Sequence, residues 1–441
     1  MSKKVALHNL GCKVNAYEVE AMQQLLEKAG YEIVPFEEGA DVYLINTCTV
    51  TNIADRKSRQ MLHKAKKMNP DSIVIATGCY AQADTEKLKE DTAVDLIVGN
   101  NQKNQIVEVL EAYEREHTKQ VQVIEINKTH EYEELSIDST AEHVRAYIKV
   151  QDGCNQFCTY CIIPFARGRV RSRNIADVCQ EVETLAKRGY KEVVLTGIHL
   201  SSYGVDFEAE HKESLLSLIQ AVSKVDGIKR IRLGSLEPRI ITEEFLEGIT
   251  ATGKVCPHFH LSLQSGCDKT LKNMNRRYSA QEYIDKCALI RKYYPNPALT
   301  TDVIVGFPME SDEDFEESYE FVKKIRFYET HIFKYSRRQG TRAAAFDGQI
   351  IEAEKARRSE KMLALHETRA SEYEESMLGK ELELLIEEKI EINGKEWYVG
   401  HSREYIRAVI PVTDEYKVND LVLVKATGFL QDHIMSSCFL Q

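Results

Sequence analysis

The chain has 441 residues, a length typical of about three domains at roughly 150 residues each. Hydrophobic residues make up 43% and charged residues 29%, with 9 Pro and 22 Gly, so disordered and collagen-like proteins are excluded. The 58 basic and 69 acidic residues give a net charge of −11, which argues weakly against nucleic-acid binding unless the basic residues cluster.

No run of about 18 apolar residues occurs, and the N-terminus MSKKVALHNL lacks the apolar core of a signal peptide. We therefore expect a cytoplasmic protein with no membrane association. Disulfides do not persist in that reducing compartment, so the 11 cysteines indicate metal binding or catalysis.

Residues 1–112 alternate between short apolar runs and helical patterns, which predicts a mostly parallel α/β sheet covered on both faces. The expected strands are 5–10, 41–47, 72–78 and 94–100, and the expected helices are 16–29, 53–68 and 85–89. Residues 113–142 are charged and weakly periodic, and they are interpreted as a linker with a candidate strand at 122–126.

A longer β/α series occupies residues 143–372. The expected strands are 145–150, 192–197, 229–235, 259–264, 299–307 and 330–336, and the expected helices are 175–188, 213–224, 242–249, 280–293 and 312–325. This number of elements predicts a partial or complete β/α barrel, with reactive groups on the loops that follow the strands.

The last part of the chain, residues 373–441, is expected to form a small antiparallel β-barrel. A charged helix over 352–378 ends at Gly379 as a plausible cap, and strands follow at 381–392, 396–402, 405–411 and 420–428. Asn393-Gly394 predicts a tight turn between the first two of these strands.

Three cysteines, Cys154, Cys158 and Cys161, stand in the string DGCNQFCTYC just after the first barrel strand. Three thiolates in one loop can ligate three irons of a cubane cluster and leave the fourth iron open to a substrate or cofactor. The alternative is structural zinc, which prefers four ligands. The next cysteine, Cys179, falls in a predicted helix, so iron is favoured.

Cys12, Cys48 and Cys79 each follow a strand of the N-terminal sheet. Because loops after parallel strands gather at one edge, these three can converge on a second cluster; the alternative is that each is a small buried packing residue. The remaining cysteines are interpreted as packing residues: Cys179, Cys256, Cys267, Cys287 and Cys438.

The CxxxCxxC string at the head of a β/α barrel resembles the radical S-adenosylmethionine (SAM) enzymes. The dispersed N-terminal cysteines and the C-terminal barrel make the whole chain similar to the methylthiotransferases within them. Segments 153–173 and 256–266 look most like the branch that modifies threonylcarbamoyladenosine next to the tRNA anticodon, and 46–51 and 300–308 support the wider family. Two loops depart from the family pattern, at Met309-Glu310-Ser311 in place of Gly-Glu-Thr and at Arg342 in place of Pro.

The resemblance implies an N-terminal methylthiotransferase domain (1–112), a linker (113–142), a radical SAM core (143–372) and a TRAM domain (373–441). It implies SAM and two 4Fe-4S clusters as cofactors. The cluster on Cys154, Cys158 and Cys161 would bind SAM, and the cluster on the three N-terminal cysteines would carry the sulfur of a methylthio group added to carbon 2 of the adenine. The implied partners are the tRNA anticodon stem-loop and an electron donor such as a flavodoxin or ferredoxin.

Further SAM contacts are expected at Gly197, Glu237 and Gln264, because each lies where a barrel strand ends. The alternatives are that Gly197 only serves a tight turn and that Glu237 is a solvated loop carboxylate.

Basic residues cluster in three places that could surround a phosphate backbone. Residues 52–68 carry a net charge of +5 and residues 321–345 one of +6, and four arginines follow the cysteine loop, namely Arg167, Arg169, Arg171 and Arg173. The alternative for 64–67 is a solvated helix face, whereas a cofactor or an RNA phosphate is the expected partner of the four arginines. Residues 378–441 carry −4, so RNA binding there would need a local patch or stacking aromatics, namely Arg403, Arg407, Lys425, Trp397 or Tyr398, although core packing is favoured for Trp397.

Three other functions stay open from the residues. The first two are methylthiotransferases that act on isopentenyladenosine in tRNA or on a ribosomal protein side chain. The third is an iron–sulfur RNA-binding module without catalysis.

Overall fold

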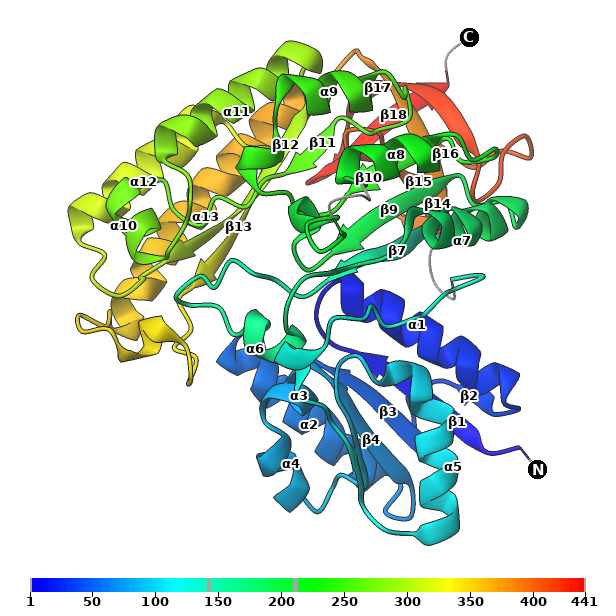
Figure 1. Ribbon diagram of the computed structural model, residues 1–441. Coiled ribbons are helices and arrows are strands. Elements are labelled where there is room, and N and C mark those ends of the chain that lie inside the picture. The colour runs from blue at the N-terminus through cyan, green and yellow to red at the C-terminus, as the bar shows by residue number, and fades with distance from the viewer. Residues whose placement is uncertain (1, 141–143, 209–212, 440–441) are drawn as a thin grey trace.

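The computed structural model describes residues 2–140, 144–208 and 213–439 (Figure 1). A parallel N-terminal sheet, an open β/α barrel and a closed C-terminal β-barrel follow one another along the chain, which confirms the predicted α/β fold class. None of the helices in these described ranges is long and apolar enough to cross a membrane.

The N-terminal sheet has six parallel strands in the order β2-β1-β3-β4-β5-β6. Its elements are β1 (Lys4–Asn9), α1 (Lys13–Lys28), β2 (Glu32–Val34), β3 (Val42–Thr47), α2 (Asn52–Met68), β4 (Ile73–Gly78), α3 (Cys79–Ala83), α4 (Thr85–Glu90), β5 (Leu96–Val98), α5 (Ile106–Glu116) and β6 (Gln120–Gln122). The strand expected at 122–126 is wrong, because β6 ends at Gln122. The short β2 was not predicted.

The central strand β3 explains why this sheet is covered on both faces. Tyr43 and Ile45 pack in the cluster that contains Leu62 of α2, whereas Val42 and Leu44 pack against residues of α1 and α5. Alternate residues of a strand point to opposite faces, so an apolar run of this kind stays stable only with helices on both sides.

The second unit consists of two sheets, β10-β9-β7-β8 and β11-β12-β13. Their elements are β7 (Arg145–Asp152), α6 (Ile163–Arg167), β8 (Arg171–Ser172), α7 (Ile175–Lys187), β9 (Glu192–Gly197), α8 (Leu215–Ser223), β10 (Arg230–Leu233), α9 (Glu243–Thr250), β11 (His258–His260), α10 (Asp268–Asn273), α11 (Ala280–Tyr293), β12 (Ala298–Val305), α12 (Asp312–Ile325) and β13 (Glu329–Lys334).

Parallel bridges from Ile231 to Val255 and from Leu236 to Leu261 join the two sheets. Within the described residues β13 does not pair with β7, so the barrel is partial and open on that side. Helix α1 of the N-terminal unit lies along β7 at this opening (Figure 1), and its buried Tyr17 donates a hydrogen bond to Leu135 O at 2.6 Å.

The structure shows the backbone setting of both departures from the family pattern, although nothing in it explains Met at position 309. Met309 has φ +65°, a left-handed conformation that favours glycine, so Met is strained there. Ser311 caps α12 by accepting a hydrogen bond from Asp314 N, a role that Thr fills equally. Arg342 begins a short 3₁₀ helix (Arg342–Ala345), a first helical position that also suits Pro.

The long helix α13 (Glu352–Glu375) leads into a closed barrel in the order β14-β15-β16-β18-β17. Its strands are β14 (Glu381–Ile392), β15 (Lys395–Ser402), β16 (Arg407–Pro411), β17 (Leu421–Gln431) and β18 (Ile434–Phe439). Asn393 and Gly394 both have positive φ, which confirms the predicted tight turn. The helix ends four residues before the predicted cap Gly379, and β16 pairs with β18 in parallel, unlike the other pairs.

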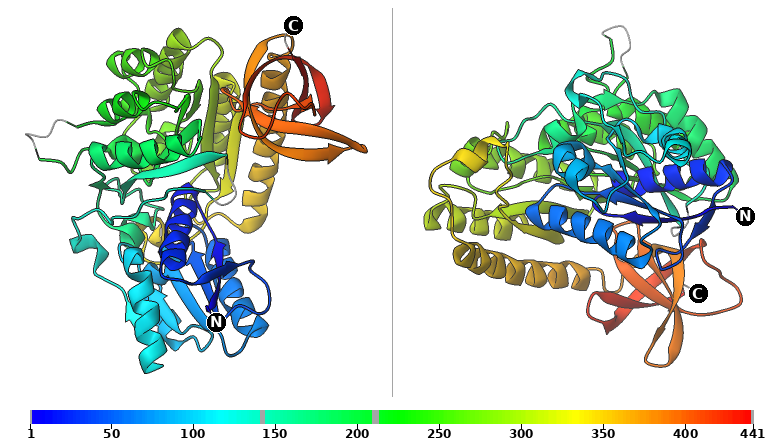
Figure 2. Two further views of the ribbon diagram at one scale, coloured as in Figure 1. Left: turned by 90° about the vertical axis from the view of Figure 1, so that its right-hand side faces the viewer. Right: turned by 90° about the horizontal axis from the view of Figure 1, so that it is seen from below.

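The C-terminal barrel packs beside the β/α barrel (Figure 2), where the strands of the latter begin. Arg230 Nε lies 2.8 Å from Glu383 Oε1, and Arg232 Nη2 donates to Ser402 O at 2.6 Å. The ring of Tyr405 lies under the guanidinium of Arg145, 5.0 Å from its centroid. The N-terminal ends of these strands are therefore covered, and chemistry is left to the opposite end.

Candidate functional site

The first cysteine group lies in the loop directly after β7. Gly153 has φ +70°, and a Cβ there would lie 1.8 Å from Arg169 O, so only glycine fits. The loop then folds back on itself, because Cys154 N donates to Gly168 O and Cys161 N donates to Cys158 O, both at 3.0 Å.

These three sulfurs influence one another electrostatically. Burial raises the pKa of the Cys154 thiol to about 11, and the negative charge of Cys158 adds to the shift. Burial, followed by the charge of Cys158, also raises the pKa of Cys161. Three thiolates crowded in this way need a cation between them, so the donor set fits an iron–sulfur cluster with three protein ligands.

Arg276, which was not singled out from the sequence, also contacts this group. Its Nη1 donates to Cys158 Sγ at 3.3 Å, and its guanidinium lies 4.9 Å from the ring centroid of Tyr278. Arg276 stands 118 residues after Cys158, in no recognisable motif, so the sequence carries no signal for this contact.

The second group consists of Cys12, Cys48 and Cys79. β1, β3 and β4 pair in register up to their last residues, so the loops that follow them lie at one edge of the sheet. A Cβ built on Gly11 would lie 3.3 Å from Cys48 Sγ, which shows how closely the first two loops approach. Burial raises the pKa of Cys48 to about 12, with further contributions from the charges of Cys79 and Cys12.

Arg167 connects this second group to the loop that carries the first cysteine group. Its Nε donates to Cys79 Sγ at 3.2 Å, and its Nη2 donates to Asn15 Oδ1 at 2.7 Å. The same Asn15 oxygen accepts a contact from Cys12 Sγ at 3.7 Å. One guanidinium on α6 therefore contacts both Cys79 and the Asn15 partner of Cys12.

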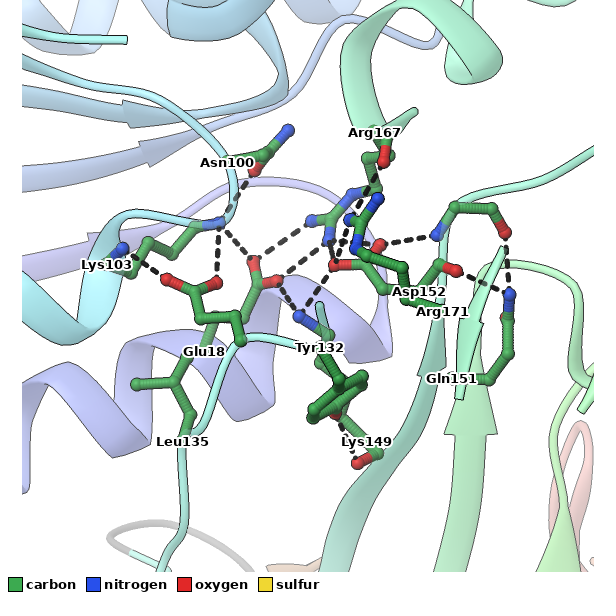
Figure 3. Close-up of polar contacts among 12 residues, drawn as sticks. Glu18, Asn100, Lys103, Tyr132, Leu135, Lys149, Gln151, Asp152, Arg167 and Arg171 are labelled. Carbon is green, nitrogen blue, oxygen red and sulfur yellow. Dashed lines mark hydrogen bonds and ion pairs between the residues drawn. The ribbon is translucent and has the colours of Figure 1, made fainter. Parts of the chain in front are cut away.

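Arg167 belongs to a buried network of charges between the two units (Figure 3). It donates to both carboxylate oxygens of Glu18, at 2.8 and 3.0 Å, and its Nη1 lies 3.2 Å from Asp152 Oδ1. Lys149 lies 2.8 Å from Glu18 and 2.7 Å from Asp152. Three further members complete the network, namely Arg171 at 3.6 Å from Asp152, Lys103 at 3.3 Å from Glu18, and Glu133 at 3.9 Å from Lys103.

The prediction of an RNA phosphate as the partner is therefore wrong for three of the four arginines, whereas a cofactor as the partner stays a prediction. Arg167 and Arg171 are fully buried, and Arg173 is buried in an ion pair with Glu181. Arg169 alone of the four is exposed, and its guanidinium lies 4.5 Å from the ring centroid of Phe157. The alternate spacing of these arginines in the sequence does not reveal that buried carboxylates pair with them in the folded protein.

Among the predicted SAM contacts, Gly197 is the last residue of β9, whereas Glu237 and Gln264 lie four residues beyond the ends of β10 and β11. A Cβ on Gly197 would lie 2.8 Å from Gln151 Oε1, so a side chain there would displace Gln151. Glu237 is buried, pairs with Arg239 at 3.1 Å, and its charge is among the causes that raise the pKa of Cys154, so the solvated-carboxylate alternative is wrong. Gln264 has φ +73°, and its N donates to Asp302 O at 2.8 Å.

Polar side chains line the inner face of the second sheet. His260 Nε2 lies 3.3 Å from Asp302 Oδ2, while its Nδ1 lies 2.9 Å from Thr300 Oγ1. A nitrogen of His331 on β13 completes a set of possible ligand atoms that lie within 4.8 Å of one another. Phe333, two residues further along β13 and therefore on the same face, is 45% exposed.

Lys13, the first residue of α1, is exposed, although enough protein surrounds it to perturb its ammonium. Burial lowers the pKa of Lys13, and the positive charges of Arg145 and Arg232 lower it further.

The two basic segments predicted from the sequence meet in space. Arg338 Nη1 contacts Asn52 at 2.6 Å and Asp55 at 2.5 Å, both at the start of α2. The surrounding basic side chains are exposed, namely Arg56, Lys57, Arg59, Lys64, Lys67, Lys334, Arg337 and Arg342.

Parts of the expected C-terminal RNA patch are already engaged. Arg403 donates to Gly253 O and Val255 O of the β/α barrel, at 2.9 and 3.1 Å, and Tyr398 is buried. Lys425 is exposed, and Trp397 packs against a small apolar cluster, as expected. The packing prediction is confirmed for three cysteines, Cys256, Cys267 and Cys287, whereas Cys179 is half-buried and Cys438 is exposed.

Comparison with known proteins adds independent evidence. Residues 4–99 match the Uncharacterized protein family UPF0004, and residues 148–322 match the Radical SAM superfamily. A Bacillus subtilis protein named threonylcarbamoyladenosine tRNA methylthiotransferase MtaB is 41% identical and covers 96% of this chain and 93% of its own. The Aquifex aeolicus protein of that name is 43% identical over 88% of this chain and 93% of its own.

A Pelotomaculum thermopropionicum protein named tRNA-2-methylthio-N(6)-dimethylallyladenosine synthase is 36% identical over 98% of this chain and 97% of its own. Among solved structures, the radical SAM methyltransferase TsrM from Kitasatospora setae matches with a TM-score of 0.57 and 15% identity, covering 78% of this chain and 74% of that one. At this identity the likeness supports the fold alone.

Proposed function

Because this chain belongs to the radical SAM methylthiotransferase family, we propose that it adds a methylthio group to carbon 2 of threonylcarbamoyladenosine next to the anticodon of tRNA. The observation that carries the proposal is the contact of Arg167, which follows the loop of the first cysteine group, with Cys79 of the second group. Two cysteine groups joined across one interface suit a reaction in which both contribute to a single product.

Enzymes of this family use SAM and two 4Fe-4S clusters, which supply the radical chemistry, the methyl group and the sulfur. We assign one cluster to Cys154, Cys158 and Cys161, and the auxiliary cluster to the three N-terminal cysteines. Gly197, Glu237 and Gln264 are assigned to SAM binding.

The protein's own side chains hold and tune these groups. Arg276 and Arg167 each donate an N–H to a ligand sulfur, which stabilises negative charge on that sulfur. The buried charge network of Figure 3 fixes α1, and with it Cys12, against β7. The C-terminal barrel covers the far end of the β/α barrel and excludes water from that side.

The exposed basic residues of α2 and of the segment after β13 are assigned to the phosphates of the anticodon stem-loop. The target base must leave the loop stack to enter the barrel, which costs a few kcal/mol. An electron donor such as a flavodoxin or ferredoxin completes the system, in the cytoplasm. The proposal retains the division into 1–112, 113–142, 143–372 and 373–441.

Mass spectrometry of tRNA nucleosides tests this function. Cells that lack the protein should lose the methylthio form of threonylcarbamoyladenosine, and the wild-type gene should restore it where Cys154→Ala does not. Loss of the methylthio form of the dimethylallyl nucleoside instead would move the assignment to that substrate. Unchanged nucleosides would refute a tRNA substrate, and absence of 5′-deoxyadenosine from the reduced, reconstituted protein with SAM would refute catalysis.

A further inference from the structure

We propose that His260, Asp302 and His331 form a binding site for a divalent transition metal ion, separate from both cysteine groups. The three residues stand on the neighbouring strands β11, β12 and β13. The site is independent of the proposed function, because none of its ligands is a cysteine and no step of the proposed reaction uses it.

The register of the sheet brings these three side chains to one place. Asp302 and His331 are direct partners in the pairing of β12 with β13. His260 is the partner of Thr300, which lies two residues before Asp302 and therefore on the same face of β12. The next residue, Val303, points the other way into the apolar core, so the three side chains face the inside of the open barrel.

The atoms available for coordination are close enough for one ion. His260 Nε2 lies 3.3 Å from Asp302 Oδ2, and a nitrogen of His331 completes a set of atoms that all lie within 4.8 Å of one another. In a tetrahedral site with bonds of about 2.0–2.1 Å, ligand atoms lie about 3.4 Å apart, so the first pair already has this spacing. His331 is exposed, so its ring is free to rotate toward the other two ligands.

The surroundings of His260 are those of a metal-binding histidine. Its Nδ1 lies 2.9 Å from Thr300 Oγ1, and histidine ligands almost always donate their second N–H to a neighbouring oxygen. With its proton on Nδ1, His260 directs the lone pair of Nε2 toward the carboxylate of Asp302, and two acceptors so placed attract a cation. His331 stacks on His260 with ring centroids 5.7 Å apart, and within the described residues its ring makes no hydrogen bond. Both imidazoles therefore have a nitrogen available to the ion.

The donor set selects the kind of ion. Two imidazole nitrogens and one carboxylate oxygen suit zinc, cobalt(II) or iron(II), whereas calcium and magnesium prefer oxygen ligands alone. Three protein ligands leave at least one coordination position for water, and the exposure of His331 provides a path of entry for the ion.

An ion bound here stabilises the edge of the open barrel. In the part of the chain that the structure describes, β13 is the last strand of its sheet and pairs only with β12. One ion held by residues of β11, β12 and β13 links these strands, so β13 separates from the sheet only when the ion is released. Metal binding therefore shifts the opening equilibrium of this edge toward the closed form.

The competing explanation is a simple hydrogen bond from His260 Nε2 to Asp302, with the Thr300 hydroxyl as the donor to Nδ1. Charge-assisted hydrogen bonds of this kind are about 2.7–2.9 Å long. The observed separation of 3.3 Å is longer. This explanation gives His331 no role, so it predicts that replacement of His331 leaves metal binding unchanged.

The test adds zinc to the anaerobically reconstituted holoenzyme, because zinc is distinguishable from the iron of the clusters. Elemental analysis should find one zinc per chain with unchanged iron, and X-ray absorption at the zinc edge should show nitrogen and oxygen neighbours at about 2.0–2.1 Å. His331→Gln and Asp302→Asn should each weaken zinc binding roughly a hundredfold or more. Thr300→Val, which keeps all three ligands, should weaken it about tenfold.

His63→Gln is the matched control, because His63 forms an exposed pair with Asp91 at 2.9 Å and should bind zinc as the wild type does. Equal iron content shows that each variant has folded. With free zinc a hundredfold above its dissociation constant, hydrogen exchange in β13 should slow roughly a hundredfold in the wild type and stay unchanged in His331→Gln.

Three results would overturn the inference. The first is zinc bound through sulfur at about 2.3 Å, and the second is no retained zinc. The third is equal zinc binding by His331→Gln and the wild type. Unchanged exchange in β13 with zinc bound would overturn the link between the strands.

Discussion

Replacement of Arg167 by Met should weaken the contact between the N-terminal unit and the β/α barrel. Met keeps most of the aliphatic volume but removes a fully buried guanidinium with hydrogen bonds to Glu18, Asn15 and Cys79 and an ion pair to Asp152. Breaking a buried ion pair from one side costs about 3–5 kcal/mol, since the remaining charge is left without its partner.

The structure indicates that the free-energy cost of Arg167→Met lies at the low end of that range. Glu18 keeps Lys149 at 2.8 Å and Lys103 at 3.3 Å, and Asp152 keeps Lys149 at 2.7 Å. Each carboxylate therefore keeps at least one cationic partner. We expect a loss of about 3 kcal/mol, which corresponds to roughly a hundredfold change in an opening equilibrium.

Hydrogen exchange is the appropriate assay, because one unfolding midpoint is not well defined for a protein of several units. Amides of α1 and β7 should exchange roughly a hundredfold faster in Arg167→Met, with the C-terminal barrel unchanged. Arg169→Met is the matched control, since Arg169 is exposed and stacks only on Phe157. Equal protection of α1 in Arg167→Met and the wild type would refute the reasoning.

Three further predictions concern the cysteines, Arg276 and pH. Cys154→Ala and Cys79→Ala should each lose about half of the bound iron after reconstitution, measured together with sulfide, because each removes a ligand of a different proposed cluster. Arg276→Met should lower the reduction potential of the radical cluster by on the order of 50 mV in an EPR titration, since a hydrogen bond to Cys158 Sγ is lost. A hydrogen bond to Glu374 raises the pKa of His433, so stability from this pair is present below pH 6.5 and is lost as the pH rises through the raised value. The wild type should therefore lose more thermal stability than His433→Asn between about pH 6 and about pH 8.

Each of these outcomes has a control. Arg277→Met changes the exposed neighbour of Arg276 and should leave the potential unchanged. Cys438→Ala changes an exposed cysteine outside both groups and should keep all the iron. Parallel pH curves for His433→Asn and the wild type would contradict the assigned role of His433.

The convergence of Cys12, Cys48 and Cys79 could be predicted because parallel strands end at one edge of a sheet, a rule that needs only the strand pattern. The side chains that contact these cysteines could not be predicted. Arg167 donates a hydrogen bond to Glu18, which lies 149 residues earlier in the chain. The sequence shows only a series of alternating arginines, a pattern that suggests exposed side chains. Short strands such as β2 have too few residues for a period to appear.

The network at Arg167 also bears on the order of assembly. Four buried cations, Lys103, Lys149, Arg167 and Arg171, face three buried carboxylates, those of Glu18, Glu133 and Asp152. The surplus positive charge lies beside Cys79, so the interface is electrically balanced once that sulfur is an anionic ligand. By linkage, a cluster bound to the second cysteine group would stabilise the closed arrangement of the two units, so its insertion would complete the assembly of the interface.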